Sequence, residues 1–590
     1  MTRKNRYKWN LNLLYTSLND PKIEQDILNI ETLHNSFAEK YNIENKTYLN
    51  DNDQLLQVLD DYEVLMDNNS SKPSLYLNYV IHTDSVNNKA LSLSNLLDNR
   101  MTKAQNKITF FELSLAGINK DRQNDILNNK MFSKYKFFLY CIFDDSLYNL
   151  TEAEEKILNL KALPASDMWN MSHDRILSAV MIEWKGKRIP LAEANNLISG
   201  LKRIDRLELS KKISIELKKV SIFSEAEINA VVTNKKINDE LRNYRTPFEN
   251  TVRRYRNDPV IIEKLIKTVS DNFHISHKFF RLKTKILNLK SLRYSDRNAK
   301  IGEIKGEFSF DSSKMILEKA FASFDNKYAE ILNSFVKNGQ IDIYPRKGKK
   351  GGAYCSSSLH NPTFVLLNHS DNINSYTTFA HEMGHAFHSE LSKSQGPLYS
   401  SYSTSLAETA STFFESLAFD EILKTLSKKQ KIIALHNKIN SDISTIFRQI
   451  ACFNFENDIH NIVRKNGFIS KEELADLHNK HMKAYLGPIF KMEHDDGYFF
   501  VQWSHIRRFF YVYTYAYGML VSKSLLKRYR ENKNFIVSIE KFLSSGGKNT
   551  PENILKEIGV DMASGQIFQD GIDEIARDIK ELERLMRSSD

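Results

Sequence analysis

The segment Thr377–Glu390 most constrains what this chain can fold into. It contains His381-Glu382-Met383-Gly384-His385, an H-E-x-x-H motif. On an α-helix, residues four apart lie one above the other on the same face, so both imidazoles can reach one metal ion. Glu382 points about 100° away around the same turn, which suits it to take a proton from a metal-bound water rather than to bind the metal. Two imidazoles with one offset carboxylate favour zinc over magnesium or calcium, which prefer oxygen ligands.

The alternative is an amphipathic helix whose histidines fall four apart by chance. Its expected limits are a cap at Asn374 or Ser375 and a far end marked by Gly396-Pro397. Apolar neighbours would place the histidines in a partly buried helix, and buried polar groups need partners. A metal ion would be such a partner, so we expect a zinc site on this helix. The apolar neighbours are Phe379, Met383, Ala386 and Phe387.

A third ligand is expected from the helix that follows, because catalytic zinc usually takes three protein ligands and leaves one position for water. Glu408 and Glu415 lie seven residues apart and share a helix face, so both are candidates. Ser405-Leu-Ala-Glu408 also fits a capping box, in which Glu408 would serve only the helix start. Spacing alone leaves the choice open. His388, seven residues after His381, is expected to be a hydrogen-bonding neighbour rather than a ligand.

The rest of the chain indicates a mainly α fold. Apolar residues at three- and four-residue spacing recur throughout, for example Leu55, Val58, Leu59 and Tyr62, and residues 86–120 predict one long helix. Short strands are expected near 341–344, 352–356 and 363–367, with a small hairpin turning at 185–187. A soft boundary near residue 190 predicts an N-terminal helical lobe at 1–190 and a catalytic domain at 191–590.

The Gly-rich stretch Pro345–Gly352 lies between the expected strands. It lacks the G-x-x-x-x-G-K-[ST] order of a phosphate-binding loop, and no helix opens directly after it. We expect a mobile loop beside a small sheet, whose exposed strand edge could hold an extended peptide by main-chain hydrogen bonds. A solvent-exposed hairpin turn is the alternative.

Charge and cysteine content narrow the class of protein. The net charge is +10, from 83 Lys and Arg against 73 Asp and Glu, but the signs alternate along most helices, as on solvated faces, so no nucleic-acid partner is expected. Three widely spaced cysteines indicate no disulfide framework and favour a reducing cytoplasm. The N-terminal 15 residues lack an apolar core, and no run reaches the ~18 apolar residues of a membrane helix. The sequence does not indicate an oligomeric state.

Trp503–Gly518 predicts a tyrosine-rich helix. Tyr511 and Tyr515 would share one face, and Tyr513 and Tyr517 another. Phenol groups, like a histidine, can donate hydrogen bonds to the oxyanion that forms when water attacks a carbonyl. The alternative, which spacing alone favours, is a helix whose aromatic residues serve packing.

Taken in order, these motifs resemble the thimet-oligopeptidase-like zinc peptidases, and within them the oligoendopeptidase F branch. The resemblance is spread over most of the chain. Matching segments are Lys8–Tyr15 (W-D-L-x-x-L-Y in the branch), Trp169–Leu197 (its N-terminal lobe), Arg346–Tyr354 (R-K-G-K-x-x-G-A-Y), Phe379–His388 (its zinc helix) and Leu406–Glu415 (A-E-x-A-S-T-F-x-E).

The resemblance assigns roles to individual residues. It makes His381, His385 and Glu408 the ligands of one zinc ion, and so favours Glu408 over Glu415. Glu382 becomes the general base. The family's C-terminal histidine lies six residues before the first tyrosine of its Y-V-Y, a position that His505 takes here before Tyr511.

Tyr511 and Tyr515 then become partners of the carbonyl or oxyanion. Two departures stand out: Ile506-Arg507 where the family has F-Y, and Asn374-Ser375 where it has an acidic pair before the zinc helix.

The resemblance also implies a large, two-lobed helical body enclosing a deep channel, with a small β-sheet near the zinc site. The implied function is a cytoplasmic zinc endopeptidase that cleaves internal bonds of short, unstructured oligopeptides. Two alternatives are a zinc exopeptidase of dipeptidase or carboxypeptidase type, and a helical zinc-binding protein without catalysis.

Overall fold

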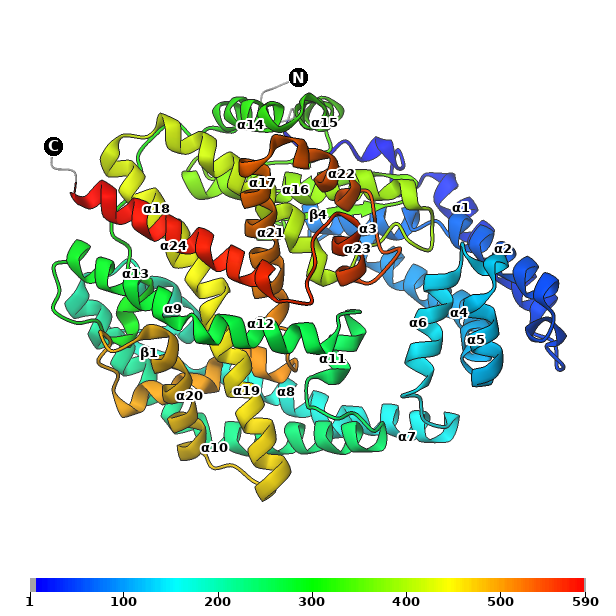
Figure 1. Ribbon diagram of the computed structural model, residues 1–590, viewed down its shortest axis with the longest axis horizontal. Coiled ribbons are helices and arrows are strands. Elements are labelled where there is room, and N and C mark those ends of the chain that lie inside the picture. Colours follow the sequence, from blue (N-terminus) through cyan, green and yellow to red (C-terminus); the bar gives the residue numbers. More distant parts are fainter. Residues whose placement is uncertain (1–6, 588–590) are drawn as a thin grey trace. The chain divides into compact units, whose positions relative to one another are not determined.

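The computed structural model describes residues 7–587 and is built mainly from helices, as expected (Figure 1). Residues 1–6 lie outside the described residues. They begin the N-terminal segment whose lack of an apolar core predicted that there is no secretory signal. The chain forms two compact units, each assembled from separated segments. The first unit holds the chain up to residue 148, 305–424 and 534–559; the second holds 149–304, 425–533 and the chain from 560 on. The expected boundary near residue 190 divides the chain differently from these units. The division into compact units does not test that boundary, so the domains at 1–190 and 191–590 stay a prediction.

Helices of the first unit carry regular apolar stripes that face its core. They are α1 (Pro21–Tyr41), α2 (Asn52–Asn68), α3 (Lys72–Thr83), α4 (Asn88–Ala116), α5 (Lys120–Asn128), α6 (Lys136–Ser146), α14 (Phe310–Phe324), α15 (Asn326–Asn338), α16 (Ile373–Ser392), α17 (Thr404–Thr425), α22 (Ile536–Leu543) and α23 (Pro551–Glu557). The expected long helix at 86–120 is confirmed as α4.

The second unit is helical as well, and its α21 and α24 pack along each other (Figure 1). Its helices are α7 (Glu152–Ala162), α8 (Met168–Ala179), α9 (Leu191–Ile198), α10 (Arg203–Leu241), α11 (Glu249–Arg254), α12 (Pro259–Asp271), α13 (Phe273–Ile286), α18 (Lys428–Thr445), α19 (Phe447–Asn466), α20 (Lys471–Leu486), α21 (Tyr513–Glu531) and α24 (Gln566–Arg587).

The expected small hairpin in the second unit is confirmed. Strands β1 (Met181–Trp184) and β2 (Lys187–Pro190) pair antiparallel. The two residues between them, Lys185 and Gly186, have φ of 48° and 76°. Positive φ at both central residues is the geometry of the tight turns that match strand twist.

A three-stranded sheet in the first unit has the order β3-β5-β4, with β3 (Ile341–Asp342) parallel and β4 (Tyr354–Ser358) antiparallel to β5 (Asn361–Leu366). The three expected strands are thus confirmed, with ends shifted by a few residues. Strand β4 lies at the sheet edge and, like β5, contacts α16.

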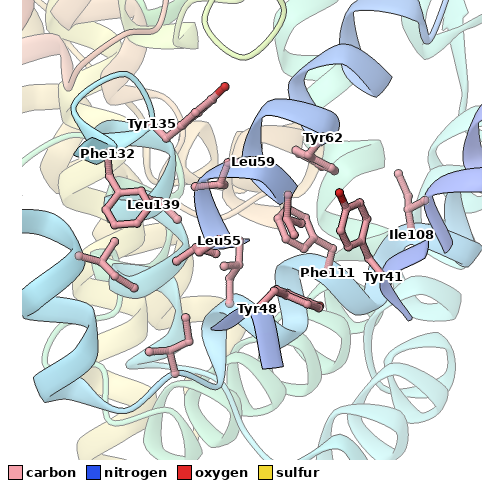
Figure 2. Close-up of a cluster of buried hydrophobic side chains, with 14 of the residues drawn as sticks. Tyr41, Tyr48, Leu55, Leu59, Tyr62, Ile108, Phe111, Phe132, Tyr135 and Leu139 are labelled. Carbon is pink, nitrogen blue, oxygen red and sulfur yellow. The ribbon is translucent and has the colours of Figure 1, made fainter. Parts of the chain in front are cut away.

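The helices at the N-terminal side pack around an aromatic core (Figure 2). Leu55, Leu59 and Tyr62 from α2 are buried there, as their spacing predicts. The Tyr62 ring lies 4.8 Å from that of Phe111, centroid to centroid, and its hydroxyl donates a 2.8 Å hydrogen bond to Glu112. Tyr62 thus buries its ring while its hydroxyl keeps a hydrogen-bond partner.

Trp9, within the N-terminal stretch that resembles the family, anchors to the sheet. Its indole Nε1 donates a 2.8 Å hydrogen bond to the carbonyl of Val365, and its ring packs against Tyr79 and Phe364. The start of the described chain therefore supports β5 directly.

Among the described residues, no helix combines the length and the apolar character needed to cross a membrane. The mainly α architecture with small sheets is confirmed, while the lobes and the channel stay a prediction.

Candidate metal centre and associated residues

Helix α16 carries the H-E-x-x-H motif and begins earlier than expected. Its N-cap is Asn372, whose side chain accepts a 3.0 Å hydrogen bond from the Ser375 backbone N–H, so the expected cap at Asn374 or Ser375 is wrong. Ser375 instead supports the loop before the helix by accepting from Ser370 N–H at 2.9 Å. The departure from the family's acidic pair therefore belongs to the capping structure of α16.

The two motif histidines lie together on one face of α16. The ring centroids of His381 and His385 are 4.9 Å apart, and both side chains are partly buried. This is the arrangement that four-residue spacing predicts.

Helix α17 approaches α16 very closely at Gly384. A Cβ atom there would lie 2.7 Å from Ser411 Cα and 3.0 Å from the Ala410 carbonyl oxygen, closer than a side chain tolerates. The absence of a side chain lets the two helices touch through their backbones. The motif pattern did not reveal this role; a glycine in the interior of a predicted helix was the available signal.

The close approach brings Glu408 to the histidines. Its Oε2 lies 3.3 Å from His381 Nε2 and 3.9 Å from His385 Nε2. One ligand atom from each of the three residues lies within 4.8 Å of the others, the one such group found among residues 7–587. Two imidazole nitrogens and one carboxylate oxygen form a donor set that fits zinc.

Glu408 and Glu415 take different positions. Glu415 Oε2 lies 3.0 Å from Nδ1 of His381, the ring nitrogen on the side away from Glu408. Glu408 accepts a 2.9 Å hydrogen bond from the Ser411 hydroxyl. Helix α17 begins at Thr404, so Ser405 already lies inside the helix and is not its N-cap residue.

Glu382 is buried beside the histidines, with 6% of its surface exposed. Its carboxylate accepts a hydrogen bond from the backbone N–H of Cys355 in β4, while Oε2 has no partner among the described residues. Burial, reinforced by the charges of Glu408 and Glu415, raises the pKa of Glu382 to about 7. A carboxyl group with that pKa can both take and return a proton near neutral pH.

The other titratable groups divide into neutral and charged forms. Burial lowers the pKa of His385 to about 4. Burial also disfavours the charged forms of His381 and Glu408, but the contact between the two side chains outweighs this effect. The contact, together with Glu415, raises the pKa of His381 to about 10. It lowers the pKa of Glu408 to about 2. Metal binding at this group would therefore release a proton from His381.

His388 is not the hydrogen-bonding neighbour that we expected. Its ring is buried and stacks on Tyr402, with centroids 3.6 Å apart and an interplanar angle of 7°. Its Nδ1 has no hydrogen-bond partner among the described residues. His388 thus packs against the rings of Tyr402 and Phe542 instead of hydrogen-bonding a candidate ligand.

The loop from Pro345 to Gly352 is anchored, which contradicts the expected mobile loop. Asp342 forms a bidentate ion pair with Arg346 at 2.6 and 2.9 Å and a second pair with the fully buried Lys349 at 2.7 Å. Lys349 also donates to the Tyr344 carbonyl at 3.0 Å. The basic residues that looked like a solvent-exposed turn therefore fasten the loop to the sheet.

His505, Tyr511 and Tyr515 form a second cluster, within the second unit. His505 Nδ1 lies 2.5 Å from the Tyr511 hydroxyl, and the Tyr511 and Tyr515 rings are 5.8 Å apart. Burial, then the charges of Arg448 and Arg508, lower the pKa of His505 to about 4, so its imidazole is neutral at neutral pH.

The expected continuous helix at 503–518 is wrong. His505 lies in a 3-10 turn (Ser504–Arg507), and α21 starts only at Tyr513. Between them Phe509 and Phe510 adopt left-handed backbone conformations, with φ of 49° and 61°. Long-range contacts hold this turn: Phe510 N–H donates to Glu456 at 3.0 Å.

The tyrosines still separate into two faces, as spacing predicted. Tyr513 and Tyr517 are fully buried, and Tyr513 donates a 3.0 Å hydrogen bond to Asn257. Tyr511 and Tyr515 are only partly buried. Arg507, at a position where the family pattern has an aromatic residue, is buried in an ion pair with Glu227 at 2.8 Å.

Comparison with known proteins places the chain in a family. Residues 217–574 match Peptidase family M3. The chain is 26% identical over 506 residues to Group B oligopeptidase PepB of Streptococcus agalactiae, covering 82% of each, and 25% identical to an oligoendopeptidase F homolog of Borreliella burgdorferi, covering 98% of each. The crystal structure of a Chlamydophila abortus protein shares the fold, with a TM-score of 0.85, 22% identity and 98% of both chains covered. The chain belongs to Peptidase family M3.

Proposed function

We propose that this chain is a zinc-dependent oligoendopeptidase that hydrolyses internal peptide bonds of short, unstructured peptides. Membership of its family implies a metal ion and a peptide substrate. The observation that carries the proposal is the convergence of His381, His385 and Glu408 on one point. The names of the relatives, an oligopeptidase and an oligoendopeptidase F homolog, support the substrate class.

His381, His385 and Glu408 would hold the zinc ion. When bound there, zinc supplies a Lewis acid that polarises water and the scissile carbonyl. Glu415 accepts a hydrogen bond from Nδ1–H of His381. This contact fixes the tautomer in which Nε2 is unprotonated, and it orients the ring so that Nε2 can bind the metal. Glu415 is therefore a positioning residue, and Glu408 the third ligand.

Glu382 acts as the general base. It takes a proton from the attacking water and passes it to the leaving amine. Its burial and its Oε2, which has no partner among the described residues, support this role, because one carboxylate oxygen is left to accept a proton.

His505, with Tyr511 or Tyr515, is proposed to donate a hydrogen bond to the oxyanion of the tetrahedral intermediate. His505 Nδ1 and the Tyr511 hydroxyl are 2.5 Å apart, so one of their two protons is used in the hydrogen bond between them. The second proton, on Nε2 or on the hydroxyl, is proposed to be donated to the oxyanion.

The edge strand β4 is the proposed binding strand for an extended substrate. Its Cys355 N–H reaches Glu382, so the strand edge runs beside the general base. A peptide added to this edge would make main-chain hydrogen bonds, which suits unstructured peptides of varied sequence.

The cytoplasm is the proposed site of action. Cys141, Cys355 and Cys452 are all free thiols. Unpaired cysteines without a disulfide fit a reducing compartment. Retention of the enzyme with cytoplasmic markers after cell fractionation would test this assignment.

Digestion of end-blocked peptides of graded length, read by mass spectrometry, tests the proposed function. We expect internal cleavage, loss of cleavage with a chelator, and recovery on addition of zinc. Cleavage that requires a free terminus would assign an exopeptidase instead. Zinc binding without hydrolysis of any peptide would leave a non-catalytic zinc protein.

A further inference from the structure

A cavity of about 480 Å³ lies within the second unit, separate from the residues assigned above. Side chains from α9, α19 and α20 line it, together with the turns at 294–298 and 494–503. Three of the lining residues are cations, Arg297, Lys300 and Arg448, and none of the described lining residues carries a carboxylate. The cavity is therefore a concentration of positive charge without its own counter-charge.

The two arginines are held by aromatic rings rather than by acids. Arg448 lies 4.7 Å from the ring of Trp503, and Arg297 lies 3.8 Å from the ring of Tyr294, each measured to the ring centroid. The buried Nε of each guanidinium has no hydrogen-bond partner among the described residues. Arg297 also donates a 2.9 Å hydrogen bond from Nη1 to the Tyr294 carbonyl, whereas ring stacking orients Arg448 without using its donors.

Buried cations of the same unit differ from the partly buried Arg297 and Arg448. Arg206 meets Asp296 at 2.6 Å, and Lys523 meets Asp442 at 2.8 Å. A buried charge without a partner is costly, so proteins pair it. Arg448, by contrast, has neither an ion pair nor a side-chain hydrogen bond with any residue in 7–587.

Neutral donors in the cavity wall are also unpartnered. Trp503 is 6% exposed and Ser295 5% exposed, and neither the indole Nε1–H nor the serine hydroxyl finds a partner among the described residues. Nearly all native buried polar groups are hydrogen-bonded, so unpartnered donors beside one cavity are a reason to look for a ligand there. An indole N–H and two guanidinium groups can only donate, so that ligand must accept.

We propose that this cavity binds a small metabolite carrying phosphate or carboxylate groups. Its volume exceeds what a single phosphate needs. Asn195 donates to Gln502 at 2.7 Å, and Asn298 accepts from Asn440 at 3.4 Å, so the remaining donors and acceptors of these amides could bind the uncharged polar part of the molecule. Arginine suits both groups because its fork of donors matches two oxygens at once. The cavity lies near His505. Its lining residue Arg448 is followed in the chain by Gln449, and the amide nitrogen of Gln449 lies 3.4 Å from His505 Nε2.

Isothermal titration calorimetry of the full chain tests the proposal without reference to peptide hydrolysis. The probes are inorganic pyrophosphate and citrate at constant ionic strength, which separate the phosphate source from the carboxylate source. We expect saturable binding of at least one probe, weakened about 10- to 100-fold in Arg448→Gln because a charged donor is lost.

Arg281→Gln is the matched control, because it removes the same charge from an exposed site on α13 outside the cavity. Binding in this variant should equal that of the wild type. If Arg448→Gln does not fold, Lys300→Gln removes another positive charge from the cavity lining. Lys300 is exposed, so this variant should fold. Absence of saturable binding, or an equal loss in Arg281→Gln, would overturn the proposal.

Discussion

The metal cluster and the histidine–tyrosine cluster are built on different kinds of backbone. His381, His385 and Glu408 project from two continuous helices that touch at Gly384. His505 and Tyr511 lie on either side of a left-handed turn between a 3-10 turn and α21. Helical periodicity therefore places His381 and His385, and the α16–α17 contact adds Glu408, whereas the second group depends on contacts with residues distant in the sequence.

Glu382→Gln should produce the largest effect. Removal of the general base is expected to lower turnover by about 10⁴-fold, since glutamine cannot accept the proton. Zinc content, measured by mass spectrometry of the purified protein, should stay near one ion per chain. Substantial cleavage by this variant would refute the role of Glu382.

Glu408→Ala and Glu415→Ala separate the ligand from its supporting carboxylate. We expect zinc affinity to fall by at least about 10³-fold in the first variant, because a ligand is lost. In the second it should fall about 10- to 100-fold, as is usual for partners of metal-bound histidines. The reverse order in metal titrations would exchange the two assignments.

Tyr511→Phe addresses the second cluster. Loss of one oxyanion donor is expected to lower kcat by about 10²- to 10³-fold with little change in KM or zinc content. Tyr517→Phe, which removes a buried hydroxyl from the opposite face, is the control and should retain kcat. Equal kcat values for wild type and Tyr511→Phe would shift the role to Tyr515.

Gly384→Ala tests the close contact between α16 and α17. The added Cβ must push Ser411 and its helix away, at a cost of about 1–3 kcal/mol of stability. Zinc affinity should fall about tenfold, because Glu408 moves with α17. Gly351→Ala is the control, since a Cβ there meets nothing within 4 Å, and thermal unfolding with zinc titration compares the two.

Glu456→Gln should have the smallest effect on turnover and a clear effect on pH dependence. Burial raises the pKa of Glu456 to about 8, so in the folded protein this group keeps its proton at pH values where the unfolded chain has lost it. Its contribution to stability is full below its ordinary pKa of 4.5 and is lost as pH rises toward 8.

The glutamine variant should lack this loss while keeping an acceptor for Phe510 N–H. Urea unfolding at pH 5 and pH 8 should show a fall in stability of at least about 1 kcal/mol that is present in the wild type and reduced in the variant. Identical pH dependence in both proteins would place a different group in control.

The sequence allowed prediction wherever local periodicity decided the structure. The H-E-x-x-H helix, α4 and the hairpin at 181–190 follow from patterns within a few residues. The break at Phe509–Phe510 did not, because Glu456 holds it from more than 50 residues away.

The prediction of a mobile loop at Pro345–Gly352 failed for the same reason. From the sequence alone Lys349 would be expected to be exposed to solvent. Its ion pair with Asp342 forms only when the sheet is folded. Spacing likewise left Glu408 and Glu415 open, and the family resemblance favoured Glu408; in the structure Glu408 lies 3.3 Å from His381 Nε2 and Glu415 3.0 Å from its Nδ1.

Trp9 bonds to a carbonyl 356 residues later in the chain, and α22 packs against α16 from residues 536–543. The unit that contains the metal cluster therefore cannot close until the ribosome has made nearly the whole protein. At about 5–20 residues per second, that takes roughly half a minute to two minutes. Under the proposed function, the nascent chain carries no complete hydrolytic centre during this time, because residues 534–559 belong to the unit that holds His381, His385 and Glu408.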